Sequence, residues 1–400
     1  MRTILFITDL YAGSRVPMLT GAREVCSQLG MHVEEIELYR IEDPIEKVIE
    51  YWKPAGCIIE GSGKLSIKSR AYASIPVVHI DPDDKILADP NAFTVTNDAE
   101  KIADLAVAEL AKTECRHFAF VGWTRRVGWS IRRERRFCDL LKRMGRSFSV
   151  MNDTWTVGNK ADFASRLRPF LAKLPKPCGI FAVNDNFATA ILNVCRMEGI
   201  SVPGEAFVIG VDDEPAICDN IRPSLSSVRP DFTGAGRIAA RLLAQLIDNP
   251  RLTPVKRLYS PVGFTSRLSS RRIAAHSWRI FAALDLIRRE ACGGLKASDV
   301  VKAFWTSERC AEMEFKAAIG KRITEEITDV RLEHVKELLS RPAQSITPIA
   351  NMCGWDSDIY LKRLFKQRTG MTMREWRVRQ GKLGNRPRAT STPLAYTPSP

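Results

Sequence analysis

The sequence predicts two folds in one chain: an α/β region over residues 1–264 and an all-α region over residues 280–380. In the first region, short continuous apolar runs alternate with stretches of helical spacing, which is the pattern of parallel strands joined by helices. In the second region, apolar residues recur at helical spacing with no strand-like run between them. The length of 400 residues fits this division, because single cores seldom grow beyond about 250–300 residues.

Each element of the α/β region follows from its apolar pattern. The runs that predict buried strands are residues 2–8, 32–38, 55–61, 75–81, 117–122, 178–184 and 206–212. The segments in which apolar residues recur every three to four positions, and which predict helices, are 19–29, 98–111, 133–144, 162–174, 186–198 and 234–247. Strands alternating with helices in this way imply parallel sheets.

The positive charge is concentrated in the carboxyl-terminal third. The chain has a net charge of +14, and residues 265–400 contain 25 Lys and Arg against 14 Asp and Glu. A basic module beside a nearly neutral one suggests a polyanionic partner for that module, although a solvated basic face would give the same composition. No apolar stretch approaches the roughly 18–20 residues of a membrane span, so no membrane partner is expected.

The sequence contains no motif with the residue spacing that a catalytic, metal or cofactor site requires. The ten cysteines form no C-x-x-C pair, and this fits reduced thiols in a cytoplasmic protein. The loop GSGKLS at 61–66 lacks the spacing of a phosphate-binding loop, and the five histidines are isolated. We therefore expect no catalytic residue, no metal site and no cofactor.

Polar residues follow the carboxyl ends of several predicted strands, where doubly wound sheets bind ligands. The candidate ligand contacts among them are Asp9, Trp123, Asn184, Asp185 and Asp212. Each alone is also an ordinary turn or helix-capping residue, but their recurrence favours a polar cleft. Carboxylates and amides bond to vicinal hydroxyls and an indole offers a flat apolar face, so a carbohydrate suits this set.

The α/β region resembles a known family over most of its length. The run 199–247, which contains GVDDEP and RPSLSS, and the run FAVNDNFATAIL at 181–192 are similar to the sensor domain of LacI-type repressors and sugar-binding proteins. The resemblance implies a periplasmic-binding-protein-like fold of two Rossmann-like lobes, joined by crossovers near residues 97, 229 and 257. It also implies ligand contacts from Arg133, Asp185 and Asp212. The amino-terminal lobe departs from the family pattern, with Pro17 at the start of its first helix. The resemblance therefore assigns no ligand contacts to that half of the pocket.

The all-α region repeats one arrangement, a helix, a tight turn and a second helix, at 297–320 and 345–370. Each copy ends in Phe-Lys-x-x-x-Gly. Two helices joined by a tight turn are the geometry that places the second helix in the major groove of DNA. The second copy, with IANMCGW and KRLFKQRTG, resembles the AraC family of transcription regulators, and the first copy matches more loosely. The resemblance implies that the residues facing DNA, together with the helix cap Ser307 and the phosphate contact Lys366, are Arg309, Glu312, Met313, Asp358, Ile359, Lys362 and Arg363. An arginine can donate two hydrogen bonds to guanine, and a glutamate can accept one from cytosine. Met or Ile can make an apolar contact with the methyl group of thymine.

The two resemblances predict a DNA-binding transcription regulator controlled by a small carbohydrate in the cleft. Its expected partners are double-stranded DNA, a sugar effector and a second copy of the chain, with RNA polymerase as a further candidate. A linker over 265–279 is expected between the regions, and the Pro-, Ser- and Thr-rich tail 381–400 is expected to be disordered. The alternative is a regulator of the same architecture whose sensor is degenerate, or answers to a non-sugar ligand or a protein partner.

Overall fold

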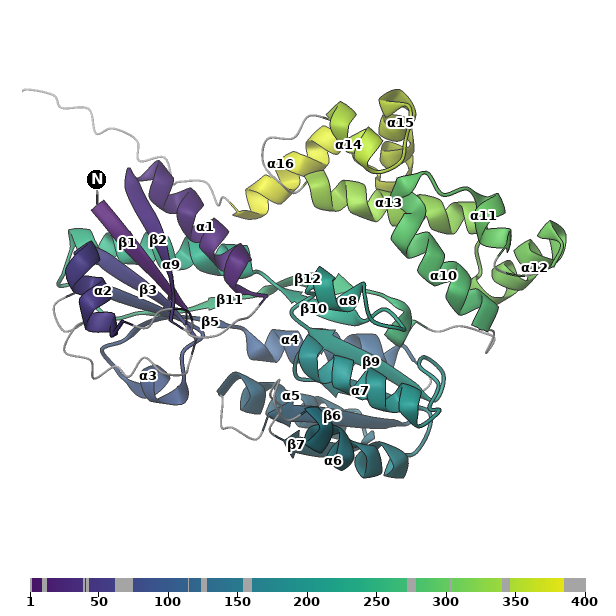
Figure 1. Ribbon diagram of the computed structural model, residues 1–400, viewed down its shortest axis with the longest axis horizontal. Helices are drawn as coiled ribbons and strands as arrows, with labels where there is room; N and C mark the ends of the chain where they lie inside the picture. Colours follow the sequence, from purple (N-terminus) through teal and green to yellow (C-terminus); the bar gives the residue numbers. More distant parts are fainter. Residues whose placement is uncertain are drawn as a thin grey trace, which may run out of the picture. The chain divides into compact units, whose positions relative to one another are not determined.

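The protein consists of two compact units, residues 1–276 and 277–400 (Figure 1). The computed structural model describes residues 2–8, 13–38, 40, 43–61, 75–113, 115–123, 128–153, 160–271, 278–302, 304, 306–339 and 346–384. The first unit is α/β and the second is all-α, which confirms the predicted fold class.

The first unit contains two six-stranded sheets. The first sheet has the order β11-β5-β4-β3-β1-β2 and comprises β1 (Arg2–Thr8), β2 (Met31–Glu37), β3 (Gly56–Glu60), β4 (Val77–Ile80), β5 (Phe93–Asn97) and β11 (Lys256–Tyr259). The second has the order β12-β10-β9-β8-β6-β7 and comprises β6 (His117–Trp123), β7 (Ser147–Asp153), β8 (Cys178–Ala182), β9 (Ala206–Val211), β10 (Ser226–Pro230) and β12 (Pro261–Thr265). Neighbouring strands pair in parallel except β10 and β12, so the carboxyl ends of most strands in each sheet share one edge.

Helices cover the faces of both sheets, as continuous buried strands require. They are α1 (Arg15–Gln28), α2 (Ile45–Trp52), α3 (Asp84–Ala88), α4 (Ala99–Ala111), α5 (Gly128–Arg143), α6 (Lys160–Lys173), α7 (Asp185–Met197), α8 (Pro215–Cys218), α9 (Phe232–Asp248) and the 3-10 helix η3 (Leu268–Ser270). Helix α9 packs on the first sheet beside α1 although it follows the second sheet in the chain. Glycine makes this contact possible, because a Cβ on Gly236 would lie 1.9 Å from the carbonyl oxygen of Met18.

The chain passes between the two sheets three times. It leaves the first sheet after Asn97, returns through Asp231 between β10 and α9, and crosses again at Ser260 between β11 and β12. The sequence placed the last two crossovers near residues 229 and 257, and these two positions lie inside β10 and β11. Connections of this kind allow two lobes to rotate about a few residues.

The structure corrects the amino-terminal end of the predicted linker 265–279. Thr265 is the last residue of β12, and Leu268 and Ser269 are buried. Ser269 is held on both sides, since its hydroxyl donates to the Val208 carbonyl oxygen (2.6 Å) and its amide to that of Ser224 (2.9 Å). The serines that made this segment look like a linker therefore satisfy buried backbone groups. Residues 272–277 lie outside the described residues.

The second unit is built from helices only among its described residues. They are α10 (Trp278–Glu290), the 3-10 helix η4 (Ala291–Gly293), α11 (Ala297–Lys302), α12 (Glu308–Ile319), α13 (Ile323–Leu339), α14 (Ile346–Met352), α15 (Asp358–Thr369) and α16 (Met373–Gly384). The two predicted motifs contain the pairs α11–α12 and α14–α15, and α13 packs against both pairs. Gly320 and Gly370 end α12 and α15 with φ of 82° and 73°, which explains the repeated glycine. Helix α16 extends into the predicted tail 381–400, of which residues 385–400 lie outside the described part.

Among the described helices, none has both the length and the apolar composition that a membrane span requires. The same part of the chain contains no group of three or more His, Cys, Asp or Glu side chains placed to hold a metal ion.

Candidate functional site

The strand ends that face the interlobe region have unusual backbone geometry. Asp81, at the end of β4, has φ of 47°, while Asp212 and Asp213, at the end of β9, have φ of 111° and 52°. Residues other than glycine seldom adopt positive φ, and such strain concentrates at functional sites. The backbone therefore marks the carboxyl ends of both sheets as the first candidate site.

Asp81 is the centre of a hydrogen-bonded cluster on the first sheet. Its Oδ1 accepts from the backbone amide of Asn97 (2.8 Å) and from the Asn97 side chain (2.9 Å). Its other oxygen accepts from the Tyr259 hydroxyl. Burial raises the pKa of Asp81, opposed by these hydrogen bonds, and raises that of Tyr259 well above its usual value. The cluster thus joins the ends of three strands in a poorly solvated place.

Arg133, on α5, connects the two lobes. Its side chain is buried, and it donates to the Val183 carbonyl oxygen (2.5 Å) and to Asn97 Oδ1 (3.5 Å). Its guanidinium carbon lies 4.8 Å from the centre of the Trp129 ring. Burial lowers the pKa of Arg133, and the negative charge of Asp212 opposes this effect. The predicted arginine therefore lies between the strand ends of both sheets.

Asp212 adds negative charge to the same region. Burial raises its pKa well above the usual value, and the nearby Asp185 raises it further, while Arg133 lowers it. Carboxylates thus gather around one buried guanidinium. A ligand that donates several hydrogen bonds would stabilise these carboxylates in their charged form.

Asn184 and Asp185 use their side chains to hold the protein itself together. Asn184 caps α7 by accepting from the amide of Phe187 (3.0 Å). Asp185 accepts from the Ser227 hydroxyl (2.7 Å) through one oxygen and from the Glu214 amide (3.1 Å) through the other. The Cys218 thiol, 3.2 Å away, also donates to Asp185, and burial raises the pKa of this carboxyl to about 7. Both residues lie where they were predicted, and their contact with a ligand stays a prediction.

Two buried N–H groups in this region have no hydrogen-bond partner among the described residues: Nε1 of Trp123 and Nε of Arg133. The Trp123 ring stands edge-on to Trp129, with ring centres 6.2 Å apart. Buried donors without acceptors are costly, so both are suited to meet ligand oxygens. Asp9 lies outside the described residues. The sequence did not single out Tyr259, the last residue of β11, or Trp129, in the first turn of α5.

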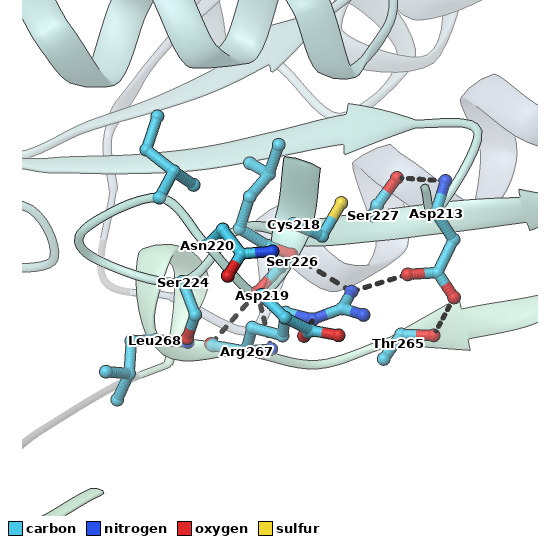
Figure 2. A network of polar contacts seen from close by, with 12 residues as sticks. Asp213, Cys218, Asp219, Asn220, Ser224, Ser226, Ser227, Thr265, Arg267 and Leu268 are labelled. Carbon is cyan, nitrogen blue, oxygen red and sulfur yellow. Dashed lines mark hydrogen bonds and ion pairs between the residues drawn. The ribbon is translucent and has the colours of Figure 1, made fainter. Parts of the chain in front are cut away.

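A second network of polar contacts joins Asp213, which follows β9, to Arg267, which follows β12 (Figure 2). Arg267 Nη1 lies 2.5 Å from Asp213 Oδ1, and its Nε lies 2.7 Å from Asp219 Oδ1. The other Asp213 oxygen accepts from the Thr265 hydroxyl (2.5 Å), and the Asp213 amide donates to Ser227 Oγ (3.0 Å). The Ser227 hydroxyl also donates to Asp185, so one chain of contacts joins Asp185 to Arg267.

Helix α12 presents one apolar and one polar face. Ser307 caps it by accepting from the amide of Cys310 (3.4 Å), while Ala311 and Phe315 are buried. The predicted recognition residues lie on the other side: Arg309 and Met313 are exposed and Glu312 is partly exposed. An exposed methionine flanked by charged residues is expected where a helix contacts base edges.

Helix α15 has the same division with more positive charge. Leu361 and Phe365 are buried, and Ser357 caps the helix through the amide of Tyr360 (3.3 Å). The exposed face carries Ile359, Lys362, Arg363 and Lys366, while Asp358 is partly exposed. Lys362 Nζ lies 2.8 Å from Asp358 Oδ2, and the Ile359 side chain is 76% exposed. All these predicted residues therefore share the accessible side of a capped helix.

Comparison with known proteins defines the class. Residues 107–270 match the periplasmic binding protein-like domain family, and residues 300–379 match the helix-turn-helix domain family. The chain is thus a DNA-binding transcription regulator that combines a periplasmic-binding-protein-like domain with a helix-turn-helix domain.

Within this class, the chain is similar along most of its length to xylose operon regulatory proteins. It is 28% identical over 365 residues to that of Escherichia coli (strain K12), covering 89% of this chain and 93% of the relative. It is 29% identical over 292 residues to that of Haemophilus influenzae, covering 72% and 76%. A solved structure described as the xylose-binding transcription activator xylR has 27% identity and a TM-score of 0.56, and covers 94% of this chain and 97% of its own.

Proposed function

We propose that the first unit binds a small neutral sugar, xylose or a related carbohydrate, and that binding controls how the second unit engages double-stranded DNA. The observation that carries the proposal is the meeting of Asp81 and Asn97 from one lobe with Arg133 and Asp212 from the other. The carboxylates accept hydrogen bonds, the amide of Asn97 both donates and accepts them, and the unpaired N–H groups donate them. Together they fit a ligand rich in hydroxyl groups. The similarity to xylose operon regulatory proteins supports this ligand class.

The proposed contacts are those predicted from the sequence. Toward the ligand they are Asp9, Trp123, Arg133, Asn184, Asp185 and Asp212, with Asp81 and Tyr259 added from the structure. Toward DNA they are Ser307, Arg309, Glu312, Met313, Asp358, Ile359, Lys362, Arg363 and Lys366. Sugar binding would close the lobes about Asn97, Asp231 and Ser260, and Arg267 would pass the change in β9 toward the second unit.

The remaining features follow from this role. The protein acts in the cytoplasm, where its DNA is, and performs no catalysis. The two helix-turn-helix motifs of one chain would enter successive major grooves about one turn (~34 Å) apart. A homodimer would double this contact. RNA polymerase is the further candidate partner, reached when the regulator is bound beside a promoter.

Calorimetry and footprinting test the two halves of the proposal. Titration of the full chain with D-xylose and other pentoses and hexoses should release heat for at least one sugar. Footprints on the DNA upstream of neighbouring genes should then change when that sugar is added. An intact footprint with no heat from any sugar would contradict sugar sensing and favour the alternative, a sensor that is degenerate or answers to a non-sugar ligand or a protein partner.

A further inference from the structure

Two cysteines that are distant in sequence meet in the second unit. Cys292 lies in η4, directly after α10, and Cys353 lies in the turn between α14 and α15. The side chain of Cys292 packs against the apolar cluster that contains Cys353. The first part of the unit thus contacts the second helix-turn-helix motif at these two cysteines.

The backbone holds these two segments together independently of the thiols. Gly354 has φ of 76°, and a Cβ on it would lie 2.9 Å from the Cys292 carbonyl oxygen and 3.1 Å from that of Ala291. Arg331, on α13, contacts both segments, because its Nε donates to the Ala291 carbonyl oxygen at 2.7 Å and its guanidinium carbon lies 5.8 Å from the centre of the Trp355 ring. Only glycine fits where the turn lies on η4, so the fold itself brings the cysteines together.

The two thiols differ in access and in acidity. Cys292 is partly exposed, whereas Cys353 is buried. The hydrogen bond from Cys353 lowers the pKa of Cys292 to about 7; burial and Glu337 oppose this, and His334 and Arg331 assist it. The partner thiol is affected in the opposite direction, and the pKa of Cys353 is raised. An accessible thiolate beside a protonated thiol is the arrangement of reactive dithiols.

We propose that Cys292 and Cys353 are an oxidisable dithiol, which a hydroperoxide such as H₂O₂ converts to an intramolecular disulfide. The Cys292 thiolate attacks one peroxide oxygen, an S–O bond forms, the O–O bond breaks, and the departing hydroxide takes up a proton to become water. The Cys353 thiol then attacks the sulfenic sulfur, the S–S bond forms, the S–O bond breaks, and the leaving hydroxide carries away the Cys353 proton as water. Two thiols lose two electrons and the peroxide gains them.

The disulfide would cross-link η4 to the turn of the second motif. The backbone of the turn already lies against that of η4 at Gly354, which favours the approach that an S–S bond of about 2.05 Å requires. The closed loop includes α11, α12, α13 and α14, so the oxidised unit should resist unfolding more than the reduced one. This modification acts on the DNA-binding unit and does not depend on the ligand proposed for the first unit.

The test uses the full chain treated with H₂O₂, blocked with N-ethylmaleimide, digested and analysed by mass spectrometry. We expect a peptide that links Cys292 to Cys353, its loss after dithiothreitol, and its absence in Cys292→Ser. The result that overturns the proposal is oxidation of the exposed Cys310 while Cys292 and Cys353 stay reduced, or a linkage of Cys292 to any other cysteine.

Alkylation rates provide a second measurement that needs no oxidation. Cys138 is the matched reference, because it is also partly exposed but burial raises its pKa. With limiting iodoacetamide at pH 7, Cys292 should react about tenfold faster than Cys138 or more. Cys353→Ala removes the hydrogen-bond donor and should bring the two rates together; equal rates in the unmodified chain would contradict the proposal.

Discussion

The cluster around Arg133 and the exposed face of α15 use positively charged side chains in opposite ways. Arg133 is 4% exposed and bonded to backbone and side-chain oxygens, whereas Lys362 and Arg363 on α15 are exposed. Buried charges must be matched to fixed partners, because an unpaired one costs several kcal/mol. Exposed charges are screened and exchange partners readily. The buried cluster therefore suits a ligand of defined shape, as proposed above, and the exposed face suits a polyanion such as DNA.

The largest expected contrast between the two regions is their response to salt. If the helices neutralise about six or more phosphates, DNA affinity should fall by about 10³-fold or more between 50 and 200 mM salt, because binding releases counterions. Binding of a neutral sugar releases none and should be nearly constant. Fluorescence anisotropy with operator DNA and calorimetry with sugar, in the same salt series, measure both. If DNA affinity and sugar affinity depended on salt concentration to a similar extent, the contrast between the two regions would be contradicted.

Removing a buried charge should cost more than removing an exposed one. Arg267→Met leaves Asp213 with one charge partner fewer in a buried site, and we expect a loss of about 3–5 kcal/mol in the stability of the first unit. Hydrogen exchange of the β10 and β12 amides measures this loss locally. Arg241→Met, on the exposed side of α9, is the matched control and should change exchange little. If these amides were equally protected from exchange in both variants, the Arg267 network would make no contribution to the stability of the first unit.

The exposed cations of α15 should matter for DNA and for little else. Lys362→Ala combined with Arg363→Ala removes two of the side chains proposed to contact bases, and a good base contact discriminates by about 1–3 kcal/mol. Specific operator affinity should therefore fall by about 100-fold or more, with loss of the footprint. The control, Lys302→Ala with Arg374→Ala, removes the same charge from exposed positions outside the two recognition helices. Undiminished protection by the first variant would refute α15 as a recognition helix.

The sequence predicted seven of the twelve strands in the described residues and missed β5, β7, β10, β11 and β12. β7 and β11 are only partly buried, because they lie at sheet edges, and β5 is buried but contains two threonines and an asparagine. Their apolar signal is correspondingly weak. Tertiary context, not local propensity, makes these segments strands.

The candidate site shows the same limit. Asp212 and Arg133 were predictable because each stands in a recognisable local motif. Tyr259 was not, since it reaches Asp81 only after the chain has crossed between the lobes for the third time. Cys292 and Cys353 were likewise two scattered thiols until α13 and Gly354 brought them together. Local patterns predict which residues lie at strand ends, and only the fold determines their partners.

The smallest expected effect, and the most selective, is that of Asp212→Asn. The change keeps the shape of the side chain but removes one negative charge from the carboxylates around Arg133. Sugar affinity should fall about tenfold or more, because a charged acceptor forms hydrogen bonds roughly twice as strong as a neutral one. DNA affinity without sugar should not change, since the DNA-facing residues lie in the other unit. Calorimetry and anisotropy on one preparation measure both, and Asp248→Asn, at an exposed position on α9, is the control. If Asp212→Asn weakened DNA binding in the absence of sugar, the cleft would be setting the resting state of the DNA-binding unit as well as responding to the ligand.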